Sequence, residues 1–295
     1  MLLKPAKSPL SRRTAPLPYL LILPTLILFA VFTYYPFLRS LFLCFTLTDK
    51  QGQPTQWVGL HNWVRVLSKE AFWDVIKTTL KIATLNLVLT FSTAMLFALM
   101  ARKTVKFSKF YQTLYALPIA IASSPAAAIF LFIYRQNNGL LNELLGTQIA
   151  WTQSMPHAVW AVVAMTAWMQ VGVGFIFLLV GFRNVPQELL ESACLDGAGP
   201  LRRIIHIILP IASPQIFFVL FLNIHSSLRN FAQIRLLTQG GPANQTKTLI
   251  YYIYENAILN GRYETACVQA LCLFGLIFLV TRLQFLLEKK VVHYQ

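Results

Sequence analysis

The chain is built from long uncharged apolar runs separated by shorter polar segments. Residues 14–38, 82–101, 110–134 and 204–228 contain no Asp, Glu, Lys or Arg. A helix needs about 20 apolar residues to cross the hydrocarbon core of a bilayer, and continuous rather than alternating hydrophobicity favours helices over a barrel. The pattern therefore predicts six membrane-spanning helices, over residues 19–43, 78–101, 110–134, 157–182, 207–229 and 264–287.

Composition supports an all-α, polytopic membrane protein. Hydrophobic residues make up 56% of the chain and charged residues only 12%, whereas soluble domains usually carry about 25% charged residues. The first apolar run is too long for a cleaved signal peptide, and no small-residue cleavage site follows it. We expect one membrane domain over residues 19–295, preceded by a polar tail over residues 1–18.

The net charge of +15 could indicate nucleic-acid binding, but the cytoplasmic flanks of membrane helices also carry excess Lys and Arg. Basic residues gather in the N-terminal tail, after the second predicted span and at the C-terminus, which share one side if six spans alternate. We predict a multi-pass protein of the cytoplasmic membrane with both termini cytoplasmic, in contact with lipid and without a nucleic-acid partner. The residues concerned are Lys4, Lys7, Arg12, Arg13, Arg102, Lys103, Lys106, Lys109, Lys289 and Lys290.

Two longer segments fall on the opposite, outer side of this map. Residues 44–77 contain Trp57, Trp63 and Trp73 among other apolar side chains. They predict helices lying in the membrane interface, where Trp is favoured, with a contact surface for an outside partner as the alternative. In residues 230–263, the run Gly240-Gly241-Pro242 breaks any helix, and the helical pattern returns before Gly261 as a re-entrant or interfacial helix.

A polar island over residues 186–210 separates the fourth and fifth predicted spans. Pro186 suits the first turn of a short helix, and Asp196-Gly197 predicts a turn because glycine accepts positive φ at little cost. Gly199-Pro200 then begins a second short helix that ends near Pro210. We expect a helix–turn–helix elbow on the cytoplasmic side, with small residues at its bend that let another protein approach closely.

The island resembles the EAA motif of ABC importer permeases, which are type I (MetI-like) membrane proteins. Ser192 replaces the usual Ala and Ile204 replaces the usual Phe. Other stretches, including DGAGPLRR and FYQTLYALP, resemble the carbohydrate-uptake (maltose permease-like) family, within it most closely the permeases for glycerol phosphate. The positions in register with the motif are Glu191, Ala193, Asp196, Gly197, Ala198, Ile207, Leu209, Pro210 and Pro214.

The resemblance implies a division of labour between chains. The elbow would be the coupling helix that docks into a groove of a cytoplasmic ATPase, and two ATPases, a sister permease and an extracytoplasmic solute-binding protein would complete the importer. The chain has no phosphate loop of its own, so we expect no bound cofactor and ATP with Mg²⁺ in the ATPase. The predicted docking residues are Glu191, Ser192, Ala193, Asp196, Gly197 and Ala198.

Polar residues inside membrane spans are costly and can mark a substrate pathway. By position in the related maltose permease subunit, sugar contacts fall near a set of residues in spans 4 and 5. Hydrogen bonding between helices is the alternative interpretation of each. The candidate pathway residues are Thr166, Gln170, Ser226, Ser227, Arg229 and Asn230.

An anionic solute would favour a cation facing the cavity, for which Arg229, Lys81, Arg135 and His225 are candidates. Each charged one lies near a span end, where snorkelling to head groups is the alternative. Glycerol 3-phosphate, a glycerophosphodiester and a neutral oligosaccharide all remain open as solutes.

Other function classes fit the sequence less well. A membrane enzyme would need a catalytic constellation, and the predicted spans hold one carboxylate, Glu264, which lies at the edge of the sixth. Four cysteines without a C-x-x-C pair and five scattered histidines predict no metal site. A passive channel or secondary transporter would leave the elbow motif unexplained. We therefore expect a non-catalytic transport subunit.

Overall fold

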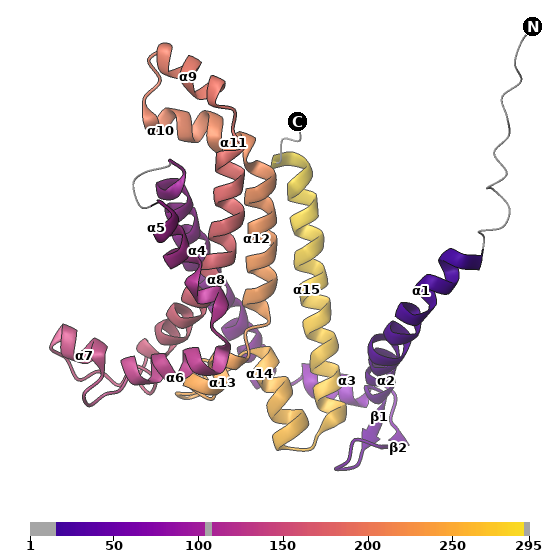
Figure 1. Ribbon diagram of the computed structural model, residues 1–295. Helices are drawn as coiled ribbons and strands as arrows, with labels where there is room; N and C mark the ends of the chain where they lie inside the picture. The colour runs from indigo at the N-terminus through magenta and orange to yellow at the C-terminus, as the bar shows by residue number, and fades with distance from the viewer. Residues whose placement is uncertain (1–15, 104–107, 292–295) are drawn as a thin grey trace, which may run out of the picture.

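The computed structural model describes residues 16–103 and 108–291. Lys4, Lys7, Arg12, Arg13 and Lys106, on which part of the predicted topology rests, lie outside these residues. Figure 1 shows helices running side by side as a bundle, with α9 and α10 projecting from one end and the hairpin β1–β2 at the other. We call these the elbow end and the opposite end.

The elements follow one another along the chain with short connections. The helices are α1 (Pro16–Phe29), α2 (Tyr35–Leu43), α3 (His61–Leu67), α4 (Glu70–Ala101), α5 (Ser108–Ala116), α6 (Ser123–Ile133), α7 (Leu140–Leu145), α8 (His157–Arg183), α9 (Gln187–Leu195), α10 (Pro200–Arg203), α11 (Leu209–Ile211), α12 (Ser213–Leu228), α13 (Ala232–Leu237), α14 (Leu249–Tyr254) and α15 (Tyr263–Val291). Four further helical turns are η1 (Ala30–Tyr34), η2 (Leu117–Ala120), η3 (Ile204–Ile208) and η4 (Glu255–Leu259), and the strands are β1 (Thr46–Thr48) and β2 (Pro54–Trp57).

Within the described residues, four helices are long and apolar enough to cross a membrane: Pro18–Leu43, Glu70–Ala101, His157–Arg183 and Tyr263–Lys289. Two further spans are formed only if each of two bent helix pairs counts as one, which gives up to six. The predicted ranges left the shape of each span open, and the third and fifth are bent. Residues 109–120 and 123–133 meet at 104°, and residues 200–211 and 213–228 meet at 74°.

Proline and extended backbone explain both bends. In the third span, Ile121 and Ala122 are extended between Pro118 and Pro125. In the fifth span, Pro210 and Pro214 flank Ala212. Each proline lacks the N–H that would continue the helical ladder, so an apolar run long enough to span folds as two arms.

The outer segment over residues 44–77 differs from the expected interfacial helices. Its first part is an antiparallel hairpin of β1 and β2, closed by Asp49, whose carboxylate accepts the backbone N–H groups of Gln51 and Gln53. Gly52 sits in the turn with φ +77°. The helix α4 then begins at Glu70, eight residues before the predicted start, and includes Trp73. The all-α prediction otherwise describes the fold.

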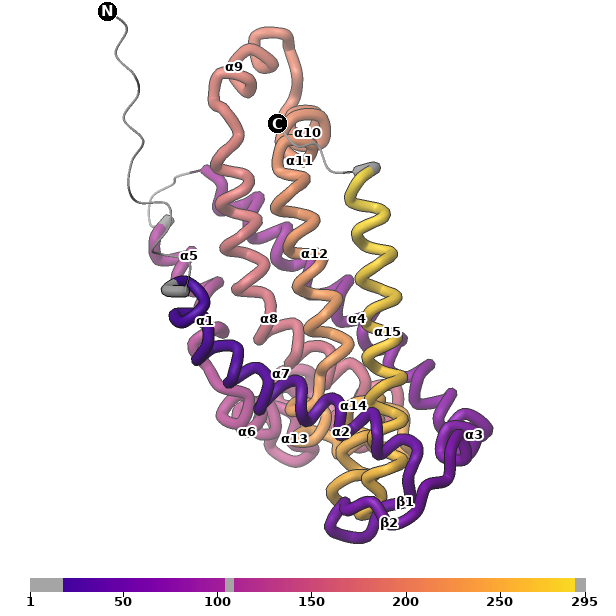
Figure 2. The backbone as a smooth tube through the Cα atoms, turned by 90° about the vertical axis from the view of Figure 1, so that its right-hand side faces the viewer, coloured from indigo at the N-terminus to yellow at the C-terminus, as the bar shows by residue number. Residues whose placement is uncertain are grey.

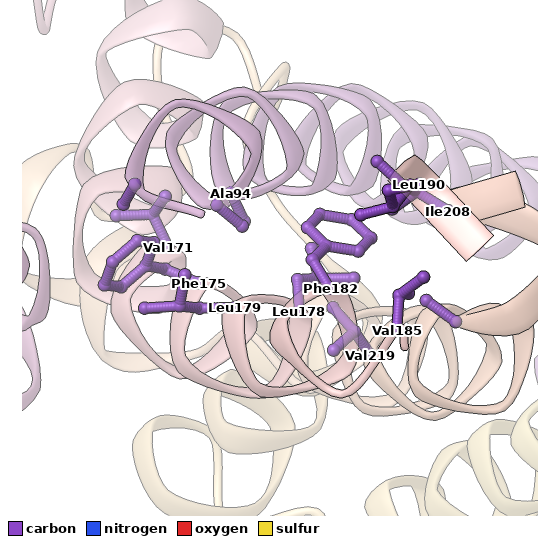
Figure 3. Close-up of a cluster of buried hydrophobic side chains, with 13 residues drawn as sticks. Ala94, Val171, Phe175, Leu178, Leu179, Phe182, Val185, Leu190, Ile208 and Val219 are labelled. Atoms are coloured by element: carbon purple, nitrogen blue, oxygen red, sulfur yellow. The ribbon is translucent and has the colours of Figure 1, made fainter. Parts of the chain in front are cut away.

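Helix α8 lies at the centre of the bundle, packed against α4 and α12. Figure 3 shows Ala94, Phe175, Leu178 and Phe182 directed into one apolar cluster between these helices. The first span contrasts with it, because residues 18–43 expose almost every apolar side chain. Figure 1 shows α1 leaning away from the bundle, and Figure 2 shows that it runs obliquely to the other helices. Lipid or another membrane protein must cover that surface, since water cannot.

Gly174 of α8 allows a close approach to both α4 and α12. A Cβ added there would lie 3.1 Å from the Ala94 Cβ and 3.2 Å from the Val219 Cγ1. Gly174→Leu should therefore lower the free energy of unfolding by about 2 kcal/mol, through overpacking, seen as a lower melting temperature in detergent. Gly275→Leu is the matched control, because an added Cβ on α15 meets no atom within 4 Å. Equal melting temperatures for the two variants would contradict the close contact.

A partly buried ion pair closes the opposite end of the bundle. The Arg65 Nη2 donates to the Glu264 Oε1 and to the Thr265 Oγ1, both at 2.8 Å. The Thr48 hydroxyl donates to the other Glu264 oxygen at 2.6 Å. The side chain of Glu264 is only 8% exposed. Since these residues come from α3, β1 and α15, the contact joins the outer segment to the last span.

Candidate functional site

The predicted elbow is present between α8 and α12. Helix α9 ends at Leu195, and Gly197 turns the chain with φ +80°. The Gly197 N–H donates to the Cys194 carbonyl, and the Ala198 N–H donates to the Ala193 carbonyl at 2.8 Å. The second arm runs through α10, η3 and α11. Pro186 caps α9 from outside rather than filling its first turn, since its ψ of 130° is not helical.

The tip of the elbow is an exposed surface of mixed character. Glu191, Ser192, Asp196 and Gly197 are exposed, and Ala193 and Ala198 are half-buried. Leu195 is 91% exposed and Leu201 is 67% exposed. Apolar side chains this exposed beside a turn of small residues suit a protein partner. The Glu191 carboxylate accepts a hydrogen bond from the Gln187 amide at 3.1 Å, and it makes no ion pair within the described residues.

The base of the elbow is fixed to the bundle. Leu190 is buried and joins Phe182 and Val185 in the cluster of Figure 3. The guanidinium of Arg183 donates to the carbonyl oxygens of Ala101 at 2.9 Å and Arg102 at 3.4 Å. A basic side chain on the last carbonyls of α4 satisfies groups that the helix end leaves unpaired. These contacts connect the base of the elbow to both α8 and α4.

A second polar region crosses the middle of the bundle. Asn86 of α4 donates from its amide to the Gln170 Oε1 at 3.1 Å and to the Ser227 Oγ at 2.8 Å. Asn230, just beyond α12, donates to the Thr166 hydroxyl at 2.8 Å. Four of the six candidate pathway residues are thus brought together, in contacts between helices.

A cavity of about 230 Å³ opens beside these contacts, between α8 and α12. Gln170, Asn223 and Ser226 are its polar lining residues. The Asn223 Nδ2 is buried and has no hydrogen-bond partner within the described residues. A solute hydroxyl or phosphate oxygen could accept a bond there, because a buried donor left unpaired costs free energy.

The candidate cations lie apart from this cavity. Arg229 is exposed, and its Nε donates to the His225 carbonyl at 3.3 Å. The His225 ring meets the Thr281 hydroxyl of α15 at 2.9 Å, which is a packing contact. Arg135 lies over the Phe132 ring. Lys81 lines a different cavity, described below.

Asn86 is the residue that the sequence interpretation missed. It lies in the uncharged run over residues 82–101, with Thr90 and Thr93 following at helical spacing. Asn86 and Thr90 are buried, and the Thr90 hydroxyl donates to the Asn86 Oδ1 at 3.3 Å. Polar residues inside a membrane span are costly and can mark a pathway, and this signal is also present on the second span.

Two solved structures share this architecture. The chain superposes on a subunit of a bacterial alginate ABC transporter, in complex with an alginate pentasaccharide-bound periplasmic protein, with a TM-score of 0.83, covering 96% of this chain and 98% of that one at 23% identity. For the MetNI methionine ABC transporter the TM-score is 0.53, with 78% of this chain and 96% of that one covered at 14% identity. These likenesses confirm the type I importer permease fold.

Closer relatives are found by sequence. The chain is 33% identical over 283 residues to the sn-glycerol-3-phosphate transport system permease protein UgpA of Escherichia coli, covering 95% of this chain and 96% of that protein. UgpA of Agrobacterium fabrum is also 33% identical, over 282 residues, with 94% and 96% covered. Residues 94–293 match the model of the binding-protein-dependent transport system inner membrane component. The chain belongs to that family and is a multi-pass, UgpA-like permease of a carbohydrate ABC importer.

Proposed function

We propose that this chain forms one half of the translocation pathway for a phosphorylated glycerol compound and couples it to ATP hydrolysis by a separate subunit. The elbow carries this proposal, because its exposed Leu195 and Leu201 flank a turn of small residues and its base is fixed to α4 and α8. Glu191, Ser192, Ala193, Asp196, Gly197 and Ala198 would contact the ATPase. The elbow end is then cytoplasmic, together with both chain termini.

Three further partners complete the importer. A second ATPase docks on a sister permease, whose surface would close the cavity at Gln170 and Ser226 from the other side. An extracytoplasmic binding protein delivers the solute at the opposite end. This chain supplies no catalytic residue, and ATP with Mg²⁺ is used by the ATPases.

A cationic cavity at the opposite end favours an anionic solute over a neutral sugar. Lys77, Lys81 and Lys247 line a cavity of about 610 Å³ with Asp74 and polar amides. Lys77 pairs with Asp74, and Lys247 pairs with Glu255, which leaves Lys81 without a partner among the described residues. The relatives are permeases for sn-glycerol 3-phosphate by name, and its phosphate would complement the Lys81 charge.

Lys81→Gln should raise the KM for glycerol 3-phosphate uptake about tenfold, because one charge-assisted contact contributes about 1.5 kcal/mol. Lys69→Gln is the control, since Lys69 is an exposed lysine just before α4 and lies outside the cavity lining. Uptake measured with a radiolabelled solute reports both. An unchanged KM for Lys81→Gln would remove this cavity from the solute path.

The proposed function is tested by reconstitution. The chain, purified with its sister permease, ATPase and binding protein, should take up glycerol 3-phosphate into vesicles only when ATP is hydrolysed. A thermal-shift panel of phosphorylated and neutral ligands on the binding protein identifies the solute class. Uptake that persists with a hydrolysis-dead ATPase would instead assign the chain to passive transport.

A further inference from the structure

A cavity of about 540 Å³ lies at the base of the elbow, behind α9. Of the six residues that would dock to the ATPase, only Glu191 lines it. Among the described residues, four cationic side chains line it, from Arg102, Lys103, Arg183 and Arg203, and one carboxylate, that of Glu191. Its volume is in the range of small-ligand sites.

The cations of this cavity are poorly neutralised by the protein itself. The Arg203 Nε is buried and has no hydrogen-bond partner within the described residues. Burial and the neighbouring charge of Arg203 both lower the pKa of the Arg102 guanidinium. The Glu191 carboxylate bonds to Gln187 rather than to an arginine. A buried N–H without a partner and two guanidinium groups in repulsion indicate that an anion completes this site.

The apolar floor of the cavity strengthens that attraction. Phe182, Val185 and Leu190 line it from below and belong to the buried cluster of Figure 3. Charges next to an apolar, water-poor surface interact more strongly than charges in bulk water. One anion bound there would be shared between Arg203 on the second arm of the elbow and Arg102 at the end of α4.

The position of the cavity indicates where the anion comes from. Helix α4 ends at Ala101 and α8 ends at Arg183, so the cavity lies at the depth where two predicted spans leave the bilayer. Basic cavities between membrane helices on the cytoplasmic side bind the head groups of anionic lipids. We propose that this cavity binds the phosphate of an anionic phospholipid head group, which ties the second arm of the elbow to α4.

This proposal relies on the proposed function in one respect, because the elbow end must be cytoplasmic. It also predicts a dependence on lipid that does not follow from the choice of solute. ATP hydrolysis stimulated by solute and binding protein should rise with the anionic lipid content of the membrane. Phosphatidylglycerol is the probe, with phosphatidylcholine as the neutral lipid.

The test uses the assembled importer, purified through this chain, and counts retained phosphatidylglycerol by native mass spectrometry after delipidation. The wild type should keep phosphatidylglycerol, and the double variant Arg102→Gln/Arg203→Gln should bind it about 30-fold more weakly, since each basic residue near a membrane surface contributes about fivefold. Arg202→Gln is the matched control, because Arg202 is exposed, adjacent in sequence and absent from the cavity lining. Equal retention by the double variant and the control would overturn the proposal.

Activity in vesicles distinguishes the lipid from other anions. Solute-stimulated ATP hydrolysis should increase with phosphatidylglycerol for the wild type and Arg202→Gln, and stay flat for the double variant. Inorganic phosphate that restores activity in phosphatidylcholine vesicles would assign the cavity to a soluble anion instead. If the ATPase dissociates from the double variant in vesicles of pure phosphatidylcholine, the cavity would instead be assigned to an acidic side chain of that ATPase. Either result overturns the lipid assignment, whereas a wild-type importer without ATP-driven uptake contradicts only the proposed function.

Discussion

Replacing Glu191 by lysine should reduce ATP-driven uptake at least 100-fold while leaving the chain in the membrane. Glu191 is exposed on α9, so the change leaves the folded bundle intact. At an interface, however, a carboxylate is expected to meet a cation of the partner, and a like charge in its place costs several kcal/mol. The measurement is uptake into vesicles, paired with retention of the ATPase during purification.

Glu188→Lys provides the comparison, because it changes the same charge on the same exposed helix three residues earlier, outside the matched motif. It should retain most of the uptake. Normal coupling in Glu191→Lys, or equal losses in both variants, would show that Glu191 has no specific role in docking.

Replacing Arg65 by alanine should lower the free energy of unfolding by about 3 kcal/mol. The change leaves the Glu264 carboxylate, whose side chain is 8% exposed, without its cation, and a carboxylate that loses its partner at such a site becomes an uncompensated charge. The melting temperature of the purified chain in detergent reports the loss. The double variant Arg65→Ala/Glu264→Gln should recover most of it, since the glutamine carries no charge.

Lys77→Ala is the control for that measurement. Its ion pair with Asp74 also joins side chains at the opposite end of the bundle, but they are 75% and 60% exposed. Exposed pairs contribute less than about 1 kcal/mol. If Lys77→Ala and Arg65→Ala lower the free energy of unfolding by similar amounts, the burial of Glu264 adds little to the strength of its ion pair.

The fold class follows from hydrophobic run lengths, because a bilayer demands about 20 apolar residues whatever the tertiary packing. Run length could not reveal the bends within residues 109–133 and 200–228. The prolines at 118, 125, 210 and 214 were visible in the sequence, but proline is tolerated inside membrane helices, so its presence alone does not predict a bend. The hairpin over residues 46–57 was missed because its Trp57 and apolar neighbours suggested an interfacial helix.

The elbow was more predictable than the pathway. Turn chemistry at Asp196-Gly197 and the following proline are local signals, and they placed the bend correctly. The contacts of Asn86, by contrast, depend on which faces of α4, α8 and α12 meet, and no single helix encodes that. The positions of Thr166 and Gln170 in the chain made both of them candidate pathway residues. Position alone could not predict that Thr166 bonds to Asn230, whereas Gln170 also lines the cavity.

The bend at Ala212 has a geometric consequence. From Ala212 the short arm reaches back to Pro200 over 12 residues and the long arm reaches forward to Ser226 over 14 residues, or about 18 Å and 21 Å at 1.5 Å per residue. Arms of nearly equal length that move as one body about Ala212 displace their two ends by similar distances. If they move in this way, a shift of a few ångströms at Leu201 is matched by a shift of similar size at Ser226, turned through the 74° between the arms.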